Sequence, residues 1–376
     1  MKKILLYTDT PQIGGAEHQT YLLAKFLDKR KFTPILACSH SPALDKWCRQ
    51  FEQEGIKVIR LNVSNKHDPR HHSQLKKILK EQKIDLLHAQ VWNPASCRYA
   101  YTAAKATKTP LMTTEHDPFP LPLLKDIFKK QGLKNVQRII AISKNNKQLL
   151  QKLYPAHKDK IQLVLNGIDT LWWQSQILRF TELDLEKIKT ETFQANEDTL
   201  IIISIAELHE RKGLKFLISA MPEIIKSYPN TKLVIVGEGP DRKNLEKLIR
   251  KLKMEDHIIL LGRKKEIPHL LKASNIFVLP SKREAFGLVN LEAMLTPLAV
   301  VATKVGGIPD IISHQKTGLL VRPQDTPALA RTLKQLIASP VKRKKMAKAG
   351  KSRALKLFSA KKMALAYEKI YSKILS

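Results

Sequence analysis

Residues 280–294 read PSKREAFGLVNLEAM, and this stretch decides how the second half of the chain is interpreted. It follows a strand-like apolar run at 275–279 and has the pattern of a helix that opens directly after a strand. In an open α/β sheet, ligands bind where the strands end and the next helices begin. We therefore expect Phe286, Gly287 and Leu288 in a first helical turn. Free backbone N–H groups and the positive end of the helix dipole favour a phosphate group there.

Two carboxylates flank this turn. Glu284 stands just before it, and Glu292 follows about 12 Å further along a helix that rises 1.5 Å per residue. That separation exceeds the ~5 to 9.5 Å of a glycosidase pair. It suits the two ends of an elongated ligand with phosphates between them, such as a nucleotide-sugar. Glutamates at this spacing also occur on solvated helix faces, so the pair alone leaves both interpretations open.

The size and cysteine content of the chain favour a cytoplasmic protein of two domains. With 376 residues, of which 43% are hydrophobic, the chain is long enough for two cores. Its three cysteines contain no C-x-x-C pair, which argues against a disulfide framework or a zinc site and favours a reducing compartment. The apolar run at the start is too short for a signal peptide, and no run approaches the ~18 residues of a membrane-spanning helix.

The net charge is the unusual bulk property. Lys and Arg number 66 against 34 Asp and Glu, which gives +32 and predicts attraction to a polyanion, either nucleic acid or an anionic membrane surface. Aromatic residues make up only 6%, and no nucleic-acid-binding module is recognisable. We therefore expect no nucleic-acid partner and a peripheral enzyme at the inner face of the membrane. The alternative is a basic bias throughout the source organism.

A basic amphipathic stretch at 121–138 is the expected membrane contact. Apolar insertion and attraction of cations to anionic lipids would both contribute. Its apolar residues are Leu123, Leu124, Ile127, Phe128 and Leu133, and its basic residues are Lys125, Lys129, Lys130, Lys134 and Arg138. A second basic segment at 342–362 carries no acid and is interpreted as a solvated helix face.

Apolar runs of strand length alternate with helical patterns along the whole chain. Many of these runs are apolar without alternation, which is typical of parallel strands buried on both faces. This predicts an α/β protein with two Rossmann-like domains, joined near 166–169. The polar segment 170–198 is expected to be irregular, with Trp172 and Trp173 as packing anchors. The expected strands are 4–7, 33–38, 57–61, 84–88, 111–114, 139–143 and 161–165, then 200–206, 232–237, 258–262, 275–279, 299–303 and 319–321.

The block 274–321 resembles the donor-site signature of the retaining glycosyltransferases of family 4. The matching segments are FVLPS at 277–281, REAFG at 283–287, LEAM at 291–294, VVA at 300–302, VGGIPD at 305–310 and GLLV at 318–321. This resemblance implies the GT-B architecture, in which parallel sheets of two Rossmann-like domains face each other across a cleft that holds the active site. It places an acceptor domain at 1–168, joined by a C-terminal helix at 358–376, and a donor domain at 169–357.

The resemblance further implies a hexosyl- or other glycosyltransferase that moves a sugar from a nucleotide-sugar with retention at the anomeric carbon. The acceptor would be a glycan or a lipid-linked molecule, as in cell-envelope polysaccharide or lipopolysaccharide synthesis. In the family's scheme, Glu292 holds the ribose hydroxyls and Glu284 the sugar hydroxyls. Lys212 and the amides of the turn at 286–288 offset the charge that grows on the departing diphosphate.

The loop around Lys212 departs from the family pattern. Residues 204–213 read SIAELHERKG, where the family has Gly-Arg-Leu-x-x-x-Lys-Gly and uses both the Arg and the Lys to hold the diphosphate. Lys212 and Gly213 match, but Glu207 stands at the position of the Arg. Arg211 or Arg263 is expected to supply the missing charge. A solvated Lys212 is the structural alternative in so basic a chain.

Other loops at strand ends carry further candidates. In the family, a Gly-Gly-x-Glu loop such as that of Gly14 and Gly15 closes over the donor, and a histidine at the position of His116 lies near the anomeric carbon. The loops with Gly237 and Glu238, and with Arg263, approach the nucleotide. Ordinary turns and a structural histidine are the alternatives.

No D-x-D pair that would hold a metal-bridged diphosphate is present in the sequence. We therefore expect neither a metal ion nor a cofactor. Two other classes of function stay open at this point. One is another activity on the same fold, a nucleotide-sugar epimerase or a sugar phosphorylase. The other is a basic nucleic-acid-binding protein.

Overall fold

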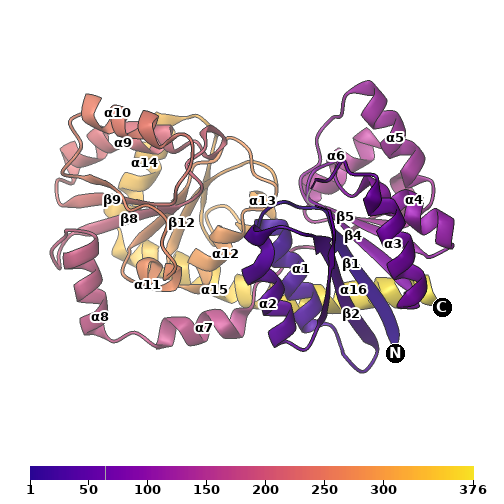
Figure 1. The fold of residues 1–376 in the computed structure, drawn as a ribbon. Coiled ribbons are helices and arrows are strands. Elements are labelled where there is room, and N and C mark those ends of the chain that lie inside the picture. Colours follow the sequence, from indigo (N-terminus) through magenta and orange to yellow (C-terminus); the bar gives the residue numbers. More distant parts are fainter. Residues whose placement is uncertain (64) are drawn as a thin grey trace. The chain divides into compact units, whose positions relative to one another are not determined.

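The structure, a computed structural model, describes residues 1–63 and 65–376. The chain folds as two compact units (Figure 1). Unit 1 comprises Met1–Gly167 together with Ala360–Ser376, and unit 2 comprises Ile168–Ser359. Each unit is a parallel sheet covered by helices.

Unit 1 contains seven parallel strands in the order β3-β2-β1-β4-β5-β6-β7. The strands are β1 (Lys2–Thr8), β2 (Phe32–Ser39), β3 (Lys57–Leu61), β4 (Leu86–Val91), β5 (Leu111–Glu115), β6 (Val136–Ala141) and β7 (Ile161–Leu163). The helices are α1 (Gly15–Phe26), α2 (Asp45–Gln53), α3 (Arg70–Glu81), α4 (Arg98–Thr107), α5 (Leu123–Leu133), α6 (Lys144–Leu153) and α16 (Ala360–Leu375), with 3-10 turns η1 (Pro42–Leu44) and η2 (Pro155–Lys160).

Unit 2 contains six parallel strands in the order β10-β9-β8-β11-β12-β13. The strands are β8 (Leu200–Ile205), β9 (Thr231–Val236), β10 (Ile258–Leu260), β11 (Ile276–Leu279), β12 (Ala299–Thr303) and β13 (Leu319–Val321). The helices are α7 (Thr170–Leu178), α8 (Glu182–Lys187), α9 (Leu214–Ser227), α10 (Arg242–Lys251), α11 (Ile267–Lys272), α12 (Leu288–Leu295), α13 (Ile308–Ile311), α14 (Thr326–Ile337) and α15 (Pro340–Leu357), with short turns η3 (Ile188–Thr192) and η4 (Glu210–Lys212).

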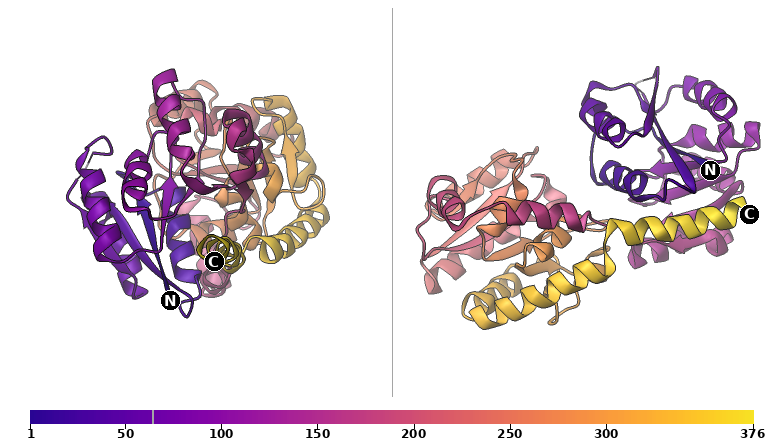
Figure 2. Two further views of the ribbon diagram at one scale, coloured as in Figure 1. Left: turned by 90° about the vertical axis from the view of Figure 1, so that its right-hand side faces the viewer. Right: turned by 90° about the horizontal axis from the view of Figure 1, so that it is seen from below.

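All thirteen predicted strands are present, and the α/β prediction is confirmed. The strands are apolar without alternation because helices bury both faces of each sheet. In unit 1, one core lies between the sheet and α3 to α6, and a second core lies between the opposite face and α1, α2 and α16. Figure 2 shows α16 running along unit 1 to a C-terminus near the N-terminus, where Met1 and Ser376 border the same surface pocket.

Each sheet reverses its direction of winding at one point, between β1 and β4 in unit 1 and between β8 and β11 in unit 2. At such a switch point the loops after the two central strands leave in opposite directions and open a crevice. Of the predicted ligand-binding residues of unit 2, Lys212 stands in the loop that follows β8, and Glu284 stands in the loop that follows β11.

The segment 170–198 is largely helical and not irregular as predicted, since it contains α7, α8 and η3. Of the two expected packing anchors, Trp173 is buried, and its Nε1 donates a hydrogen bond to Thr296 Oγ1 at 2.9 Å. Trp172 is 49% exposed, so its prediction as an anchor is wrong. Consecutive residues on a helix point about 100° apart, and only one of the two can face the core.

The stretch 121–138 also differs from its prediction. Helix α5 ends at Leu133, and Arg138 belongs to strand β6. Lys129, expected to be a surface cation, is buried, and its Nζ lies 2.7 Å from both Glu115 Oε1 and Tyr101 Oη. It occupies the face of α5 that packs on α4, so it is not available to a membrane surface.

Candidate active site

The switch point of unit 2 is formed by the loops after β8 and β11. Gly213 ends the first loop with a φ of +65°, and a Cβ there would lie 2.2 Å from the carbonyl oxygen of Pro280. Any side chain at this position would push the loops apart. The Arg211 carbonyl also accepts hydrogen bonds from the N–H groups of Lys282 at 2.8 Å and Arg283 at 3.3 Å. These contacts hold the two loops against each other.

Lys212 and Glu284 form an ion pair across this contact. Lys212 Nζ lies 2.5 Å from Glu284 Oε2, and the two side chains are only 13% and 12% exposed. Ser281 Oγ lies 3.4 Å from the same carboxylate oxygen. The backbone of Gly306 passes so close that a Cβ there would lie 1.5 Å from the Glu284 carbonyl oxygen. The fold therefore brings the predicted phosphate-binding cation and the predicted sugar-binding acid into direct contact.

Three backbone N–H groups at the start of α12, those of Phe286, Gly287 and Leu288, have no hydrogen-bond acceptor in the described part of the chain. Gly287 caps the helix with a φ of +89°, and Asn290 Nδ2 donates to its carbonyl oxygen at 3.0 Å. The helix begins at Leu288, so Phe286 precedes the first turn, and its ring packs on that of Phe358. Free amides at a helix N-terminus are suited to bind a phosphate.

Glu292 is half-buried on α12 and forms no side-chain hydrogen bond or ion pair with any residue that the structure describes. Partial burial, which removes water from the carboxyl, raises its pKa to about 7. Near neutral pH this group is therefore partly protonated, and it can accept hydrogen bonds from a ligand's hydroxyl groups or donate one.

Arg211 and Arg263, the two residues expected to replace the family's missing arginine, differ in whether they form an ion pair. Arg211 Nη2 lies 2.9 Å from Glu207 Oε2, so the acid at the family's Arg position pairs with a nearby arginine. Arg263 is exposed and pairs with no side chain in residues 1–63 and 65–376.

The loops after β9 and β10 are joined by a backbone hydrogen bond. The N–H of Gly237 donates to the carbonyl oxygen of Gly262 at 2.9 Å. Glu238 Oε1 lies 2.7 Å from Arg242 Nη1, so this predicted donor-binding acid pairs with the first residue of α10.

His116 lies at the carboxyl end of β5 in unit 1 and is buried. Its Nε2 lies 3.0 Å from Gln90 Oε1, and Gln90 Nε2 lies 3.1 Å from His88 Nε2. His88 Nδ1 in turn lies 2.6 Å from Tyr371 Oη on α16. Because the Gln90 amide offers an acceptor to one histidine and a donor to the other, it fixes which nitrogen of each ring carries the proton. Burial lowers the pKa of His116 to about 4, so the ring is neutral at pH 7.

Gly14 and Gly15 form the start of α1. The Gly14 N–H donates to Glu17 Oε2 at 2.9 Å, and the Glu17 carbonyl accepts a hydrogen bond from Trp47 Nε1 at 2.9 Å. Glu17 is buried, and this burial raises the pKa of its carboxyl above the ordinary value. The Gly-Gly loop is thus fastened to its own helix.

The sequence-predicted residues divide between the units. Unit 2 brings together Lys212, Glu284 and the amides at the start of α12, and the same helix carries Glu292. Gly14, Gly15 and His116 belong to unit 1. Three further polar residues hold these groups, namely Ser281, Glu17 and Gln90. Gln90 carried a usable sequence signal, since it is an amide near the end of a strand in which only His88 is also polar.

Comparisons with known proteins agree with this geometry. The family description "Glycosyltransferase Family 4" matches residues 13–171, and "Glycosyl transferases group 1" matches residues 186–353. N-acetyl-alpha-D-glucosaminyl L-malate synthase of Bacillus anthracis is 28% identical over 309 residues, which cover 81% of this chain and 78% of the relative. Alpha-maltose-1-phosphate synthase of Mycolicibacterium smegmatis is 28% identical over 261 residues, which cover 65% of each chain.

Solved structures show the same fold. A glycosyltransferase from Rickettsia africae ESF-5 superposes with a TM-score of 0.88 at 25% identity, over 100% of this chain and 99% of that one. Anabaena HepE, solved in complex with UDP, gives a TM-score of 0.85 at 20% identity, over 99% of this chain and 100% of that one.

Proposed function

Because the chain belongs to the glycosyltransferases of the group 1 and family 4 type and has their GT-B fold, we propose that it transfers a sugar from a nucleotide-sugar with retention at the anomeric carbon. Unit 2 would bind the donor and unit 1 the acceptor. The observation that best supports this proposal is the Lys212–Glu284 pair at 2.5 Å, next to the free amides at the start of α12. A cation, free N–H groups and a carboxylate at the ends of two parallel strands suit a diphosphate with a sugar attached.

Each donor-site group has a role in this proposal. The Lys212 ammonium has three N–H donors, so it can keep its contact with Glu284 while it binds a phosphate oxygen. The amides of 286–288 would bind the same diphosphate and offset the charge that grows on it as the bond to the sugar breaks. Glu292 would accept hydrogen bonds from the ribose hydroxyls, and Glu284 from the sugar hydroxyls. These groups supply the charge compensation without a divalent ion.

His116 would contact the sugar as a neutral ring. With a pKa of about 4 it is a poor proton acceptor at pH 7, so it is suited to orient a hydroxyl group by a hydrogen bond. Gln90 fixes its tautomer.

A panel of nucleoside diphosphates and nucleotide-sugars tests the proposal, first by thermal shift and then by transfer to candidate glycan and lipid-linked acceptors. A ligand at 100 times its Kd should stabilise the protein by about 2.7 kcal/mol. The anomeric configuration of the product, read by NMR, tests retention. Sugar conversion without an acceptor would indicate an epimerase, and consumption of free phosphate would indicate a phosphorylase. Either outcome would contradict the proposal.

We further propose that the enzyme is peripheral at the cytoplasmic face of a membrane and acts there on a lipid-linked acceptor in cell-envelope or lipopolysaccharide synthesis. Net charge supports this, as does α5, where Leu123, Leu124, Ile127 and Phe128 are between 50% and 74% exposed. In the part of the chain that the structure describes, no helix is both long and apolar enough to span a bilayer. Each cation near an anionic surface contributes about 1 kcal/mol, which supports reversible binding.

Flotation with liposomes of increasing anionic lipid content, at low and high salt, tests the membrane association. Because Lys129 is buried, the variant should change only Lys125 and Lys130 to Glu. The matched control changes Lys76 and Lys80, two exposed lysines of α3, to Glu. Flotation should require anionic lipid, decrease with salt and decrease in the α5 variant alone. No flotation at low salt would show that the association does not exist.

A further inference from the structure

A pocket of about 470 Å³ lies in unit 1 between α4 and α5. One wall is α4 with Tyr99 and Tyr101, and the facing wall is α5 with Phe128. The loop after β4, with Ala95, and the loop before α3, with His67, complete the lining. The exposed surface inside is mainly apolar. None of the residues that the proposed donor chemistry uses lines this pocket.

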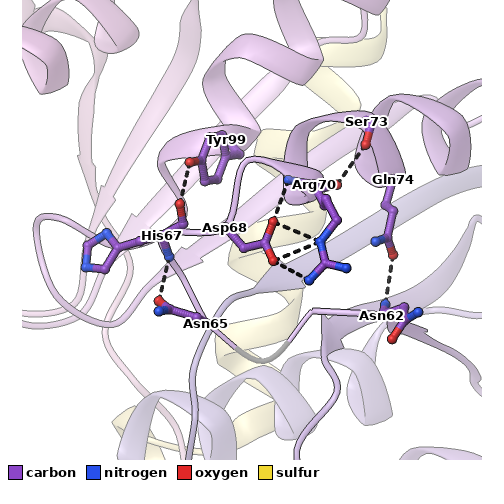
Figure 3. A network of polar contacts seen from close by, with 8 residues as sticks. All are labelled: Asn62, Asn65, His67, Asp68, Arg70, Ser73, Gln74 and Tyr99. Atoms are coloured by element: carbon purple, nitrogen blue, oxygen red, sulfur yellow. Dashed lines mark hydrogen bonds and ion pairs between the residues drawn. The ribbon is translucent and has the colours of Figure 1, made fainter.

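The walls are fixed without a ligand. The Tyr99 hydroxyl donates to the His67 carbonyl oxygen at 2.7 Å, and Arg98 Nη2 donates to the same oxygen at 2.9 Å. Figure 3 shows the Tyr99 contact together with the hydrogen bonds and ion pair that organise the rest of this loop, including Asp68 with Arg70. A ligand would therefore enter a formed pocket and cause little loss of conformational entropy.

The electrostatics of the pocket favour an anion. No acidic side chain is among its lining residues. The charge of Lys129 is balanced by Glu115 at 2.7 Å. Lys105 and Lys125 are exposed lining residues, and neither forms an ion pair with any described residue. Two uncompensated cations thus accompany an apolar interior, which is the arrangement that suits a ligand with an anionic end and an apolar end.

The two tyrosine rings that line the pocket have their faces occupied and offer little room for a stacked base or sugar. Tyr99 has the Arg98 guanidinium 4.7 Å from its ring centroid and the ring of His71 stacked at 5.9 Å. At Tyr101, Lys129 Nζ lies 5.3 Å from the ring centroid, and a Cβ on Gly132 would lie 2.8 Å from a ring atom. A flexible hydrocarbon chain, which needs no ring face, suits the remaining space.

Phe128 connects the pocket to the surface, because it lines the pocket and is 73% exposed beside the apolar residues of α5. We propose that the pocket binds one anionic phospholipid of the bilayer, with its phosphate against Lys105, Lys125 and Arg98 and one acyl chain inside. This inference deepens the membrane association proposed above and rests on it. It assigns lipid selectivity to a defined site and not to net charge alone.

Calorimetry with a short-chain lipid below its critical micelle concentration tests the pocket without a bilayer. Dihexanoyl phosphatidylglycerol should bind, and its dibutanoyl analogue should bind more weakly because each buried CH₂ contributes about fourfold in affinity. Glycerol 3-phosphate, which lacks the chains, and dihexanoyl phosphatidylcholine, which lacks the net charge, should both bind at least tenfold more weakly. Equal affinity for phosphatidylglycerol and glycerol 3-phosphate would overturn the proposal.

Two variants localise the binding. Ala95→Phe places a ring in the pocket and should abolish lipid binding, provided that its melting temperature matches the wild type. Changing Lys105 and Lys125 to Gln leaves the pocket open and should weaken binding by about fivefold for each charge removed. The control with Lys76 and Lys80 changed to Gln should keep wild-type affinity. If both pocket variants bind the lipid as the wild type does, the site is wrong.

The two proposals fail differently. A wild-type protein that floats with anionic liposomes but binds no monomeric lipid would overturn the pocket and leave the membrane association intact. A protein that does not float and binds no lipid would overturn both. Nucleoside-diphosphate binding to unit 2 is measured separately and should be unaffected by Ala95→Phe.

Discussion

Replacing Glu292 by Gln should stabilise unit 2 at pH 8 and have much less effect near pH 5. In the wild type, burial raises the pKa of this carboxyl from its ordinary 4.5 to about 7. At pH values between these two pKa values, the folded state keeps a proton on Glu292 that the unfolded chain has already released. The free energy of unfolding therefore decreases as the pH rises through this window, and the neutral amide removes this dependence.

The expected size of this effect can be bounded. A pKa of about 7 in the folded state and 4.5 in the unfolded chain corresponds to at most about 3.4 kcal/mol at pH 8, at 1.36 kcal/mol for each unit of pKa. Because Glu292 is only half-buried, water screens part of this cost, and we expect about 1–2 kcal/mol. For a unit of this size that is roughly 2–8 °C in melting temperature.

The assay is thermal unfolding of wild type and variant at several pH values from 5 to 8. The glutamine amide is itself polar and half-buried, so the substitution can change the melting temperature at every pH. The informative quantity is therefore how the difference in melting temperature between variant and wild type changes with pH. Glu255→Gln is the matched control, since Glu255 is exposed in unit 2 and pairs with no described residue. A difference that stays constant from pH 5 to pH 8 would refute a desolvated carboxyl at this position.

If Glu292 also binds ribose hydroxyls, Glu292→Ala should weaken nucleoside-diphosphate binding.

Further tests address the phosphate and sugar contacts. Lys212→Ala should raise the Kd of a nucleoside diphosphate at least tenfold, since a charged hydrogen bond contributes about 1.5–3 kcal/mol; Glu284→Ala should mainly lower kcat, and wild-type kcat/KM in both would contradict the assignment. Arg263→Ala should weaken nucleoside-diphosphate binding more than Arg211→Ala, measured by calorimetry, and the reverse order would favour Arg211. Glu207→Arg should leave this binding unchanged or tighten it, and a folded variant without binding would reveal a separate role for Glu207. Transfer should persist in EDTA, a prediction that fails if activity disappears and is restored by Mg²⁺ or Mn²⁺.

The strands were predictable because burial on both faces of a parallel sheet leaves uninterrupted apolar runs. The prediction was least accurate at β6, expected at 139–143 and observed at Val136–Ala141, and at β4, expected at 84–88 and observed at Leu86–Val91. At β4 the polar residues explain the difference. His88 and Gln90 are polar but buried there, and their polar atoms are satisfied by Tyr371 and His116. A hydrophobic pattern cannot anticipate such partners, because they come from a different strand and from the last helix.

Contacts within the site were less predictable than its location. Topology alone places the loops after β8 and β11 at one switch point. That Lys212 and Glu284 form an ion pair depends on how these loops pack, through Gly213 against Pro280. The burial of Lys129 was unpredictable for the same reason. It depends on an ion pair with Glu115 of β5, which only the packing of α5 on the rest of unit 1 brings about.

The ion pairs of unit 2 favour one of the two arginines that could replace the family's missing one. Lys212 is balanced by Glu284, and Arg211 is balanced by Glu207. A diphosphate that binds through Arg211 must compete with the Glu207 carboxylate, whereas Arg263 pairs with no described residue and is exposed. Binding through Arg263 disrupts no ion pair that the structure describes, so a ligand would not compete with a carboxylate of this chain for that guanidinium. We therefore expect Arg263, in the loop after β10, to supply the charge that the family's pattern requires, and Arg211 to contribute less because it pairs with Glu207.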